Sequence, residues 1–197
     1  VMLLGLAADQ LAGFFHVYVL SDTNDECIAR EERHYFDAMS AEWSKIIPIT
    51  YRCRTNNAGY KAGNIADFCG RWGKDHDFAL VLDADSFMAS TAIVRLVRMM
   101  QANPRLGILQ GLVIGLPSSS AFTRLFQYGM RLGMRSYTMG SAWWQADCGP
   151  YWGHNALIRL APFIVHCELP SLQSRSGLPK PILSHDLIEA ILMRRAG

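Results

Sequence analysis

The sequence predicts an α/β domain built on a mostly parallel sheet that is flanked by helices. The main observation is that apolar, strand-like segments alternate with segments of helical period along residues 1–117, which is typical of βαβ units. A second observation is the length of 197 residues, which is enough for one domain with a core. A third is that acidic residues follow two of the expected strands, at the sheet edge where such folds bind ligands.

The first part of the chain supports these elements in order. The stretch FFHVYVLSD is aromatic and β-branched and predicts a strand, and a charged stretch of helical pattern follows it. Pro48 marks the next strand as irregular, while Ser90 is expected to cap a later helix and Pro104 to end it. We therefore expect strands at residues 14–22, 45–53, 77–83 and 106–115, and helices at 24–43 and 90–104. Residues 61–73 are expected to open as a glycine-containing loop and to continue as a helix.

The composition changes after Pro117. We expect a helix over residues 118–140, an aromatic and glycine-rich passage at 142–160, a loop at 169–181, and a last helix at 182–197 that Ser184 caps. We treat residues 1–197 as a single domain with a nucleotide-sugar-binding half, 1–117, and an acceptor-binding half, 118–197. The helix at 118–140 has an apolar stripe with arginines on another face, so it either packs on the sheet or lies on a membrane surface.

The composition also excludes several classes of protein. A net charge of +2 is too small to indicate a nucleic-acid partner. The five cysteines form no CxxC pair, which argues against a disulfide framework or a zinc site and favours reduced thiols in a cytosolic setting. No apolar run approaches the roughly 18 residues that cross a bilayer. Charged residues make up 18% of the chain against roughly 25% typically, which predicts that some surface meets a partner, a membrane or further chain.

The stretch FALVLDADSF places two carboxylates at the end of an expected strand. Asp83 and Asp85 are two residues apart, so both can point toward one face. Without a partner they would repel each other, and a divalent cation such as Mg²⁺ or Mn²⁺ would remove that cost while bridging to substrate phosphates. For so short a motif, the alternative is an ordinary turn with an aspartate cap.

Two further polar motifs precede this one. KAGN, from Lys61 to Asn64, puts a lysine and a flexible glycine just before an expected helix N-terminus, which suits a diphosphate. An ordinary loop with a helix cap has the same pattern. Asp22 ends the first strand, where a carboxylate either accepts hydrogen bonds from a base or ribose or serves as a turn residue.

Two polar motifs follow it. In the Ser-His-Asp stretch that opens the last helix, Asp186 is a candidate general base and His185 is its rival, because histidine titrates near neutrality. A capping serine and an acidic first turn also explain this stretch structurally. In YWGHNA, Tyr151 and Trp152 offer flat faces for a sugar ring and Gly153 permits close approach, although buried aromatic side chains more often belong to the core.

The order of these motifs resembles the family-two inverting glycosyltransferases of the GT-A fold over nearly the whole chain. LSDTND, KAGNIADFCGRWG, VLDADS, YWGHNALIR and ILSHDLIEAILMRRAG look like the glucans biosynthesis glucosyltransferase H family. The resemblance implies an enzyme of the bacterial inner membrane, with this domain on the cytoplasmic side. Such an enzyme builds the β-glucan backbone of osmoregulated periplasmic glucans from a UDP-glucose donor and a glucan acceptor. The first strand of the GT-A fold would precede Val1.

The resemblance also implies a role for each motif. Asp22 would hold the uracil end of UDP, and Asp83 would contact the nucleotide. Asp85 would ligate Mg²⁺ or Mn²⁺, and Asp186 would deprotonate the acceptor hydroxyl. The other residues implied to bind substrate are Lys61 and Asn64 beside the nucleotide and Gly153, His154 and Asn155 on the acceptor side.

Two positions depart from the family pattern and leave acceptor handling open. His185 stands where a glutamate is usual, and His154 stands where cellulose-synthase relatives have a serine. The QxxRW motif and the transmembrane helices of the family would lie outside this chain, so we expect the chain alone to be inactive. The alternatives are a non-catalytic UDP-sugar-binding or assembly module and, less favoured, a phosphatase of the haloacid dehalogenase type, in which DxD normally lies on the first strand.

Overall fold

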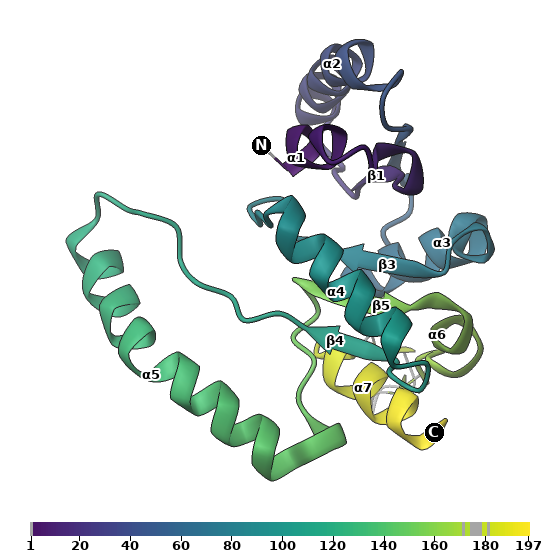
Figure 1. Cartoon of the computed structure of the whole chain (residues 1–197). Coiled ribbons are helices and arrows are strands. Elements are labelled where there is room, and N and C mark those ends of the chain that lie inside the picture. The colour runs from purple at the N-terminus through teal and green to yellow at the C-terminus, as the bar shows by residue number, and fades with distance from the viewer. Residues whose placement is uncertain (1, 171, 174–178, 181) are drawn as a thin grey trace.

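A computed structural model describes residues 2–170, 172–173, 179–180 and 182–197, and it confirms an α/β chain (Figure 1). Within the described residues, no helix combines the length and apolarity that crossing a membrane requires. The helices are α1 (Met2–Ala8), α2 (Glu26–Trp43), α3 (Tyr60–Trp72), α4 (Ser90–Ala102), α5 (Ala121–Gln145), α6 (Leu160–His166) and α7 (His185–Arg195), with short 3₁₀ turns η1 (Ala12–Phe14), η2 (Gly73–Asp75) and η3 (Ala146–Cys148). The strands are β1 (Val17–Ser21), β2 (Ile49–Cys53), β3 (Phe78–Val81), β4 (Ile108–Gln110), β5 (Ala156–Arg159), β6 (Leu172–Gln173) and β7 (Pro179–Lys180).

The sheets differ from the mostly parallel sheet that the sequence predicts. β1 and β2 do pair in parallel, with Leu20 opposite Arg52. In the second sheet, however, the strand order is β3-β5-β4, and β5 runs antiparallel to both neighbours. The prediction fails because it assigns no strand to the aromatic passage. The run ALIR within that passage is apolar enough to be buried as a central strand, so it inserts between β3 and β4 and separates them.

The start of α3 also differs from expectation. The helix begins at Tyr60, after Gly59, whose φ of 74° lies in the left-handed region that glycine adopts easily. Lys61 and Asn64 therefore lie within the first turns of the helix and not in a loop before it. This position fixes their side chains on a rigid element beside the ends of β1 and β3.

Serine caps are another point of difference. Ser90 is the first residue of α4, and Ala89 occupies the N-cap position. The Ser90 hydroxyl packs against α1, because a Cβ built on Gly5 would lie only 2.2 Å from Ser90 Oγ. Ser184 does occupy the N-cap position of α7, but its side chain makes no capping hydrogen bond. By contrast, α2 is capped by Asp25, whose carboxylate accepts from Cys27 N at 2.8 Å and from the next amide.

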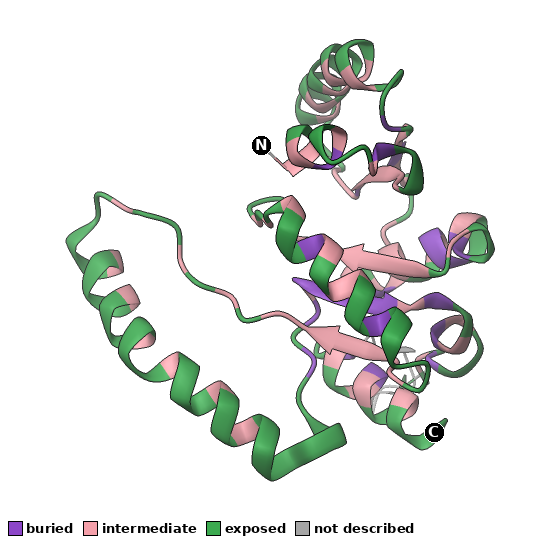
Figure 2. Ribbon diagram, in the orientation of Figure 1, coloured by how far each residue is buried: buried purple, intermediate pink, exposed green. Residues whose placement is uncertain are grey.

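β5 lies at the centre of the main core (Figure 2). Ala156, Leu157 and Ile158 are each at most 2% exposed. Helices α3, α6 and α7 contribute apolar side chains around the strand, and α4 also contacts it. The central strand comes from the second half of the chain and its two neighbours come from the first, so the halves share one core. The buried members of this core are Phe68, Cys69, Tyr151, Ala156, Ile158, Leu160, Phe163 and Cys167.

Helix α5 extends away from the rest of the molecule (Figure 1). The helix expected over residues 118–140 is confirmed, and it continues to Gln145. It follows an extended segment, residues 111–120, which the sequence predicts in part as a strand although only Ile108–Gln110 pairs. Figure 2 shows that α5 is exposed along most of its length, so its apolar stripe does not pack on the sheet as one of the two interpretations required.

Candidate functional site

The predicted acidic residues lie at strand ends. Asp22 directly follows β1, and Asp83 lies two residues after β3 ends at Val81. Asp83 also begins a tight turn, because its carbonyl accepts a hydrogen bond from Ser86 N at 2.9 Å. The two interpretations of the DADS stretch are therefore compatible: the backbone makes a turn, and that turn presents Asp85 as an exposed carboxylate.

Two arginines at the end of β2 hold Asp22: Arg52 lies within the strand and Arg54 directly follows it. Arg54 donates from Nε to Asp22 Oδ1 at 2.7 Å and makes a second bond to the other carboxylate oxygen, while Arg52 Nη1 lies 3.6 Å away. The hydrogen bond to Asp22 raises the pKa of Arg54, whereas burial lowers the pKa of Arg52. The sequence analysis missed both arginines. The signal was present, since residues two apart on a strand share a face and β2 pairs with β1.

α3 connects these two strand ends. Lys61 forms an ion pair with Asp83, and both side chains remain more than a third exposed. Asn64 donates to Leu20 O at 3.2 Å and accepts from Arg52 Nη2, so this amide ties α3 to β1 and β2. Of the residues predicted to contact the nucleotide, Lys61 and Asp83 are thus partly exposed to solvent, whereas the side chain of Asn64 is occupied by hydrogen bonds that join α3 to the sheet.

The GHN part of the aromatic passage crosses the same edge of the sheet. Asn155 has a φ of 51°, a left-handed conformation that asparagine tolerates better than most residues. Its amide donates to Val81 O at 2.7 Å, its side chain donates to Ser86 Oγ at 3.3 Å, and its carbonyl accepts from Gly111 N at 2.9 Å. Asn155 therefore joins the ends of β3 and β4 to the DADS turn.

Gln110, at the end of β4, orients the residues before Asn155. Its side-chain amide donates to His154 O at 3.0 Å, and its oxygen accepts from Trp152 N at 3.1 Å. A glutamine at a strand end has no distinctive pattern in sequence, so sequence analysis could not single it out. The structure shows that it fixes the backbone on which the predicted acceptor-side residues lie.

Gly153 lies against Asp186. A Cβ built on Gly153 would lie 3.4 Å from Asp186 Cβ and 3.7 Å from Oδ2, and the φ of Gly153 is 76°. The close approach that the sequence predicts for this glycine is therefore made to the carboxylate at the start of α7. Asp186 is half-buried at this point of contact.

The rival base faces the interior. His185 is 5% exposed, and its Nδ1 lies 3.0 Å from Oε2 of Glu189, which is 3% exposed. The His185 imidazole therefore pairs with Glu189 inside the protein and is not available to a substrate. Of the two neighbouring candidates, Asp186 is the one whose half-buried side chain lies against Gly153.

Tyr151 is placed differently from the prediction. Its ring is 1% exposed, so it belongs to the core and offers no face for a sugar, whereas Trp152 is 43% exposed. Burial and the negative charges of Glu189, Asp186 and Asp83 raise the pKa of the Tyr151 phenol. Its hydroxyl has no hydrogen-bond partner among the residues that the structure describes. The prediction is wrong for Tyr151 because its ring is buried in the core cluster around β5.

The acidic turn could hold a divalent cation only together with ligands from a bound substrate. In the described part of the chain, no three His, Cys, Asp or Glu side chains come together as a metal site. Mg²⁺ and similar ions are commonly held by one or two carboxylates plus substrate phosphates, so Asp85, with Asp83 beside it, would supply the protein's ligands in such a shared site. Asp85 is exposed and makes no ion pair within the described residues, which leaves its oxygens available.

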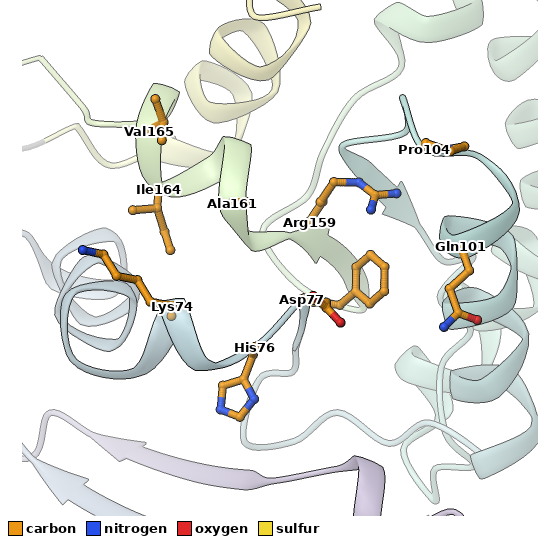
Figure 3. Close-up of a pocket in the computed structure, with 11 residues that line it drawn as sticks. Lys74, His76, Asp77, Gln101, Pro104, Arg159, Ala161, Ile164 and Val165 are labelled. Carbon is orange, nitrogen blue, oxygen red and sulfur yellow. The ribbon is translucent and has the colours of Figure 1, made fainter.

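A cavity lies away from these residues. A pocket of about 660 Å³ is lined by residues from η2, the start of β3, α4 and α6, at the opposite end of β3 from Asp83 (Figure 3). Arg159 in its wall donates to the carbonyl oxygens of Met100 at 2.7 Å and Leu106 at 3.1 Å. Its guanidinium thus closes the end of α4, and none of the predicted site residues reaches this pocket.

The geometry is that of a ligand-binding α/β protein. Carboxylates and a lysine gather beyond the ends of β1 and β3, and a glycine–asparagine segment brings the carboxylate of Asp186 to the same edge. Substrate-binding crevices of α/β proteins are built in this way.

Comparison with known proteins identifies the relatives. The chain is 43% identical over 183 residues to glucans biosynthesis glucosyltransferase H of Pseudomonas aeruginosa PAO1. The aligned region covers 93% of this chain and 21% of that protein. It is 43% identical over 183 residues to the protein of that name in Dickeya dadantii and 42% identical over 192 residues to that in Cereibacter sphaeroides, covering 22% and 32% of those proteins. No protein-family model matches. The chain is therefore related over nearly its whole length to glucans biosynthesis glucosyltransferase H. It spans about a fifth of the P. aeruginosa protein. The family resemblance seen in the sequence is confirmed.

Proposed function

We propose that this chain forms the donor- and acceptor-binding part of an inverting glucosyltransferase of the GT-A fold. The enzyme would use UDP-glucose to extend the β-glucan backbone of osmoregulated periplasmic glucans. One observation carries the proposal: within three residues, Gly153 packs against Asp186 and Asn155 bonds to Ser86 of the DADS turn. This short segment brings a candidate base and the candidate diphosphate-side carboxylates to one crevice. The names of the relatives support the reaction class.

On the donor side, charge and position suit a nucleoside diphosphate. Asp22, fixed by its two arginines, would accept hydrogen bonds from uracil, while Asn64 supports the strand end beside it. Lys61 is partly exposed and would turn from Asp83 toward the diphosphate. When bound by Asp85, a divalent cation (Mg²⁺ or Mn²⁺) would supply positive charge against the negative charge of the departing UDP.

On the acceptor side, Asp186 would act as the general base. The acceptor hydroxyl attacks the anomeric carbon from the face opposite the diphosphate, a new C–O bond forms as the bond to the diphosphate breaks, and Asp186 takes the hydroxyl proton. Trp152 is exposed beside it and offers a ring face to the sugar, and His154 neighbours the same surface. His185 is excluded from this role by its buried pair with Glu189.

The proposal includes a location. The enzyme would lie at the bacterial inner membrane with this chain on the cytoplasmic side, in contact with the UDP-glucose donor and the glucan acceptor. Because the chain spans about a fifth of the P. aeruginosa relative, we propose that it binds UDP without transferring glucose when isolated.

The test is Asp186→Asn in the intact enzyme. We expect UDP-glucose affinity to be retained and glucan synthesis to fall by about 10²–10⁴, the usual contribution of a general base. Asp9→Asn, which changes an exposed carboxylate near α1, is the matched control and should leave synthesis unchanged. Normal synthesis by the Asp186 variant would refute the assignment.

A second candidate function is UDP-sugar binding without turnover. It is favoured by the ion pair with Lys61 that already neutralises Asp83. Titration of UDP with Mn²⁺ separates the possibilities. Binding in the intact protein without transfer supports a sensor or assembly module, and no binding at all would favour a structural role or a phosphatase.

A further inference from the structure

A buried pair of ionisable side chains lies beside Asp186, and the proposed reaction does not use it. Nδ1 of His185 lies 3.0 Å from Oε2 of Glu189, and the two residues are 5% and 3% exposed. Taking a carboxylate out of water is unfavourable unless hydrogen bonds compensate for the lost hydration. The position of this pair within α7 indicates what it does.

The first turn of α7 carries both the histidine of this pair and Asp186. His185 is the first residue of the helix and Asp186 is the second. Ser184 occupies the N-cap position, but its side chain makes no capping hydrogen bond. Helix ends fray when their free amides lack such a cap. The i, i+4 contact between His185 and Glu189 ties the first turn to the second, and so it stabilises the first turn in place of a cap.

Glu189 lies on a part of α7 that the core holds in place. Its carbonyl accepts a hydrogen bond from Cys167 Sγ at 3.6 Å, at the end of α6, which packs against α7 (Figure 1). Its neighbours Ala190 and Met193 pack against the main core around β5. Glu189 is thus anchored, and it holds His185 at the less supported end of the helix.

Glu189 also lies close to the segment that faces Asp186. Burial and then the negative charge of Glu189 raise the pKa of the Tyr151 phenol, so these two side chains are neighbours in the core. Tyr151 is two residues before Gly153, and a Cβ built on Gly153 would lie 3.4 Å from Asp186 Cβ. Both sides of this contact are therefore built on residues around Glu189: the helix side through His185 and the loop side through Tyr151.

We propose that Glu189 is a positioning residue that acts through His185 to fix the carboxylate of Asp186. This inference rests on the proposed role of Asp186 as the general base. Without the pair, the first turn of α7 would shift relative to Gly153, and a displacement of about 1 Å at a reacting group can cost on the order of 10² in rate. Donor binding would be retained, because the donor side is built from α3 and the ends of β1 and β3.

The experiment measures kcat and the KM for UDP-glucose during glucan synthesis by the intact enzyme. Glu189→Met removes the acceptor of the hydrogen bond from His185, so we expect kcat to fall by about 10–100-fold while KM changes by less than about twofold. Glu189→Gln keeps an acceptor oxygen for this hydrogen bond and should keep kcat within about threefold of the wild-type value. Equal losses of kcat in the two variants, or no loss in either, would overturn the proposal.

Two further variants separate positioning from a general loss of stability. In the Asp186→Asn background, Glu189→Met should lower kcat by less than about twofold more, because the carboxylate that it positions is already gone. Phe163→Leu is the matched control, since Phe163 is a 5% exposed member of the same core and lies in α6. It should lower the unfolding midpoint by about 2–4 °C and leave kcat unchanged.

The outcomes also distinguish this inference from the proposed function. The positioning role alone is overturned if Asp186→Asn lowers synthesis but the effect of Glu189→Met multiplies with it in the double variant. It is likewise overturned if Phe163→Leu lowers kcat as much as Glu189→Met does. Normal synthesis by the Asp186→Asn variant overturns the base assignment, and the positioning role with it.

Discussion

Replacing Gly153 with alanine tests the contact on which the proposed site rests. The φ of 76° at this position lies in the left-handed region, where a non-glycine residue costs about 1–2 kcal/mol. The added Cβ would lie 3.4 Å from Asp186 Cβ, an ordinary contact, so the backbone conformation and not a clash sets the cost in stability. The free energy of unfolding should therefore fall by about 1–2 kcal/mol, which lowers the midpoint of a domain of this size by about 2–8 °C.

The effect on activity should be larger than the effect on stability. The new methyl group would lie 3.7 Å from Asp186 Oδ2. In the proposed function, an acceptor hydroxyl would approach this carboxylate through that space. Displacing the acceptor by about 1 Å can cost on the order of 10² in rate, so we expect glucan synthesis in the intact enzyme to fall between tenfold and a hundredfold.

The assays are denaturant unfolding of the chain and glucan synthesis by the intact enzyme. Gly70→Ala is the matched control, because Gly70 lies in α3 at an exposed position where a Cβ meets nothing within 4 Å. That substitution should stabilise the chain by about 0.5–1 kcal/mol through helix propensity and leave synthesis unchanged. A Gly153→Ala variant with wild-type stability and full synthesis would refute the reasoning.

The remaining predictions concern ion pairs and thiols. Asp83→Asn should change the free energy of unfolding by less than about 1 kcal/mol in a denaturant titration, because its pair with Lys61 is more than a third exposed. Arg54→Gln should cost about 1–3 kcal/mol in the same titration, because it weakens the largely buried pair with Asp22; a smaller loss than that of Asp83→Asn would contradict this ranking. Burial raises the pKa of Cys69 to about 11 and of Cys167 to about 12 from the ordinary 9.0, so their contribution to stability is complete below pH 9. As the pH rises from 9 toward 11, the unfolded thiols lose protons first, and the free energy of unfolding should fall by up to about 1.4 kcal/mol per pH unit for each thiol. The slope should flatten in the double Cys69→Ala and Cys167→Ala variant, and an unchanged slope would exclude the thiols as its cause.

Local patterns account for what the sequence predicted well. The alternation of strands and helices in the first half depends on side chains close in sequence, and β1, α2, β3 and α4 form within the expected ranges. Asp22 and Asp83 lie at strand ends as predicted, because a carboxylate that follows an apolar strand leaves the sheet at that edge. The order of the motifs along the chain, which resembles that of a known family, then grouped these two aspartates with Asp186 in one predicted site.

Non-local packing accounts for what the sequence did not predict. β5 pairs with partners about 50 to 80 residues earlier, and no local signal in ALIR reveals that pairing. The burial of Tyr151 likewise depends on core residues such as Phe68, more than 80 residues earlier, and the framework role of Gln110 depends on the path of a segment more than 40 residues later. Arg52 and Arg54 were accessible to sequence reasoning, since they are two residues apart at the end of β2, which pairs with the strand that Asp22 follows.

The antiparallel insertion of β5 has a consequence for how the chain folds during synthesis. Phe78 of β3 pairs with Arg159 of β5, so β3 and β4 wait as unpaired edges while about 50 to 80 further residues are made. At roughly 5–20 residues per second, that interval lasts several seconds. Through this period both apolar strands lack their central partner, and the second sheet can form only after the segment Gly153–Arg159 has left the exit tunnel.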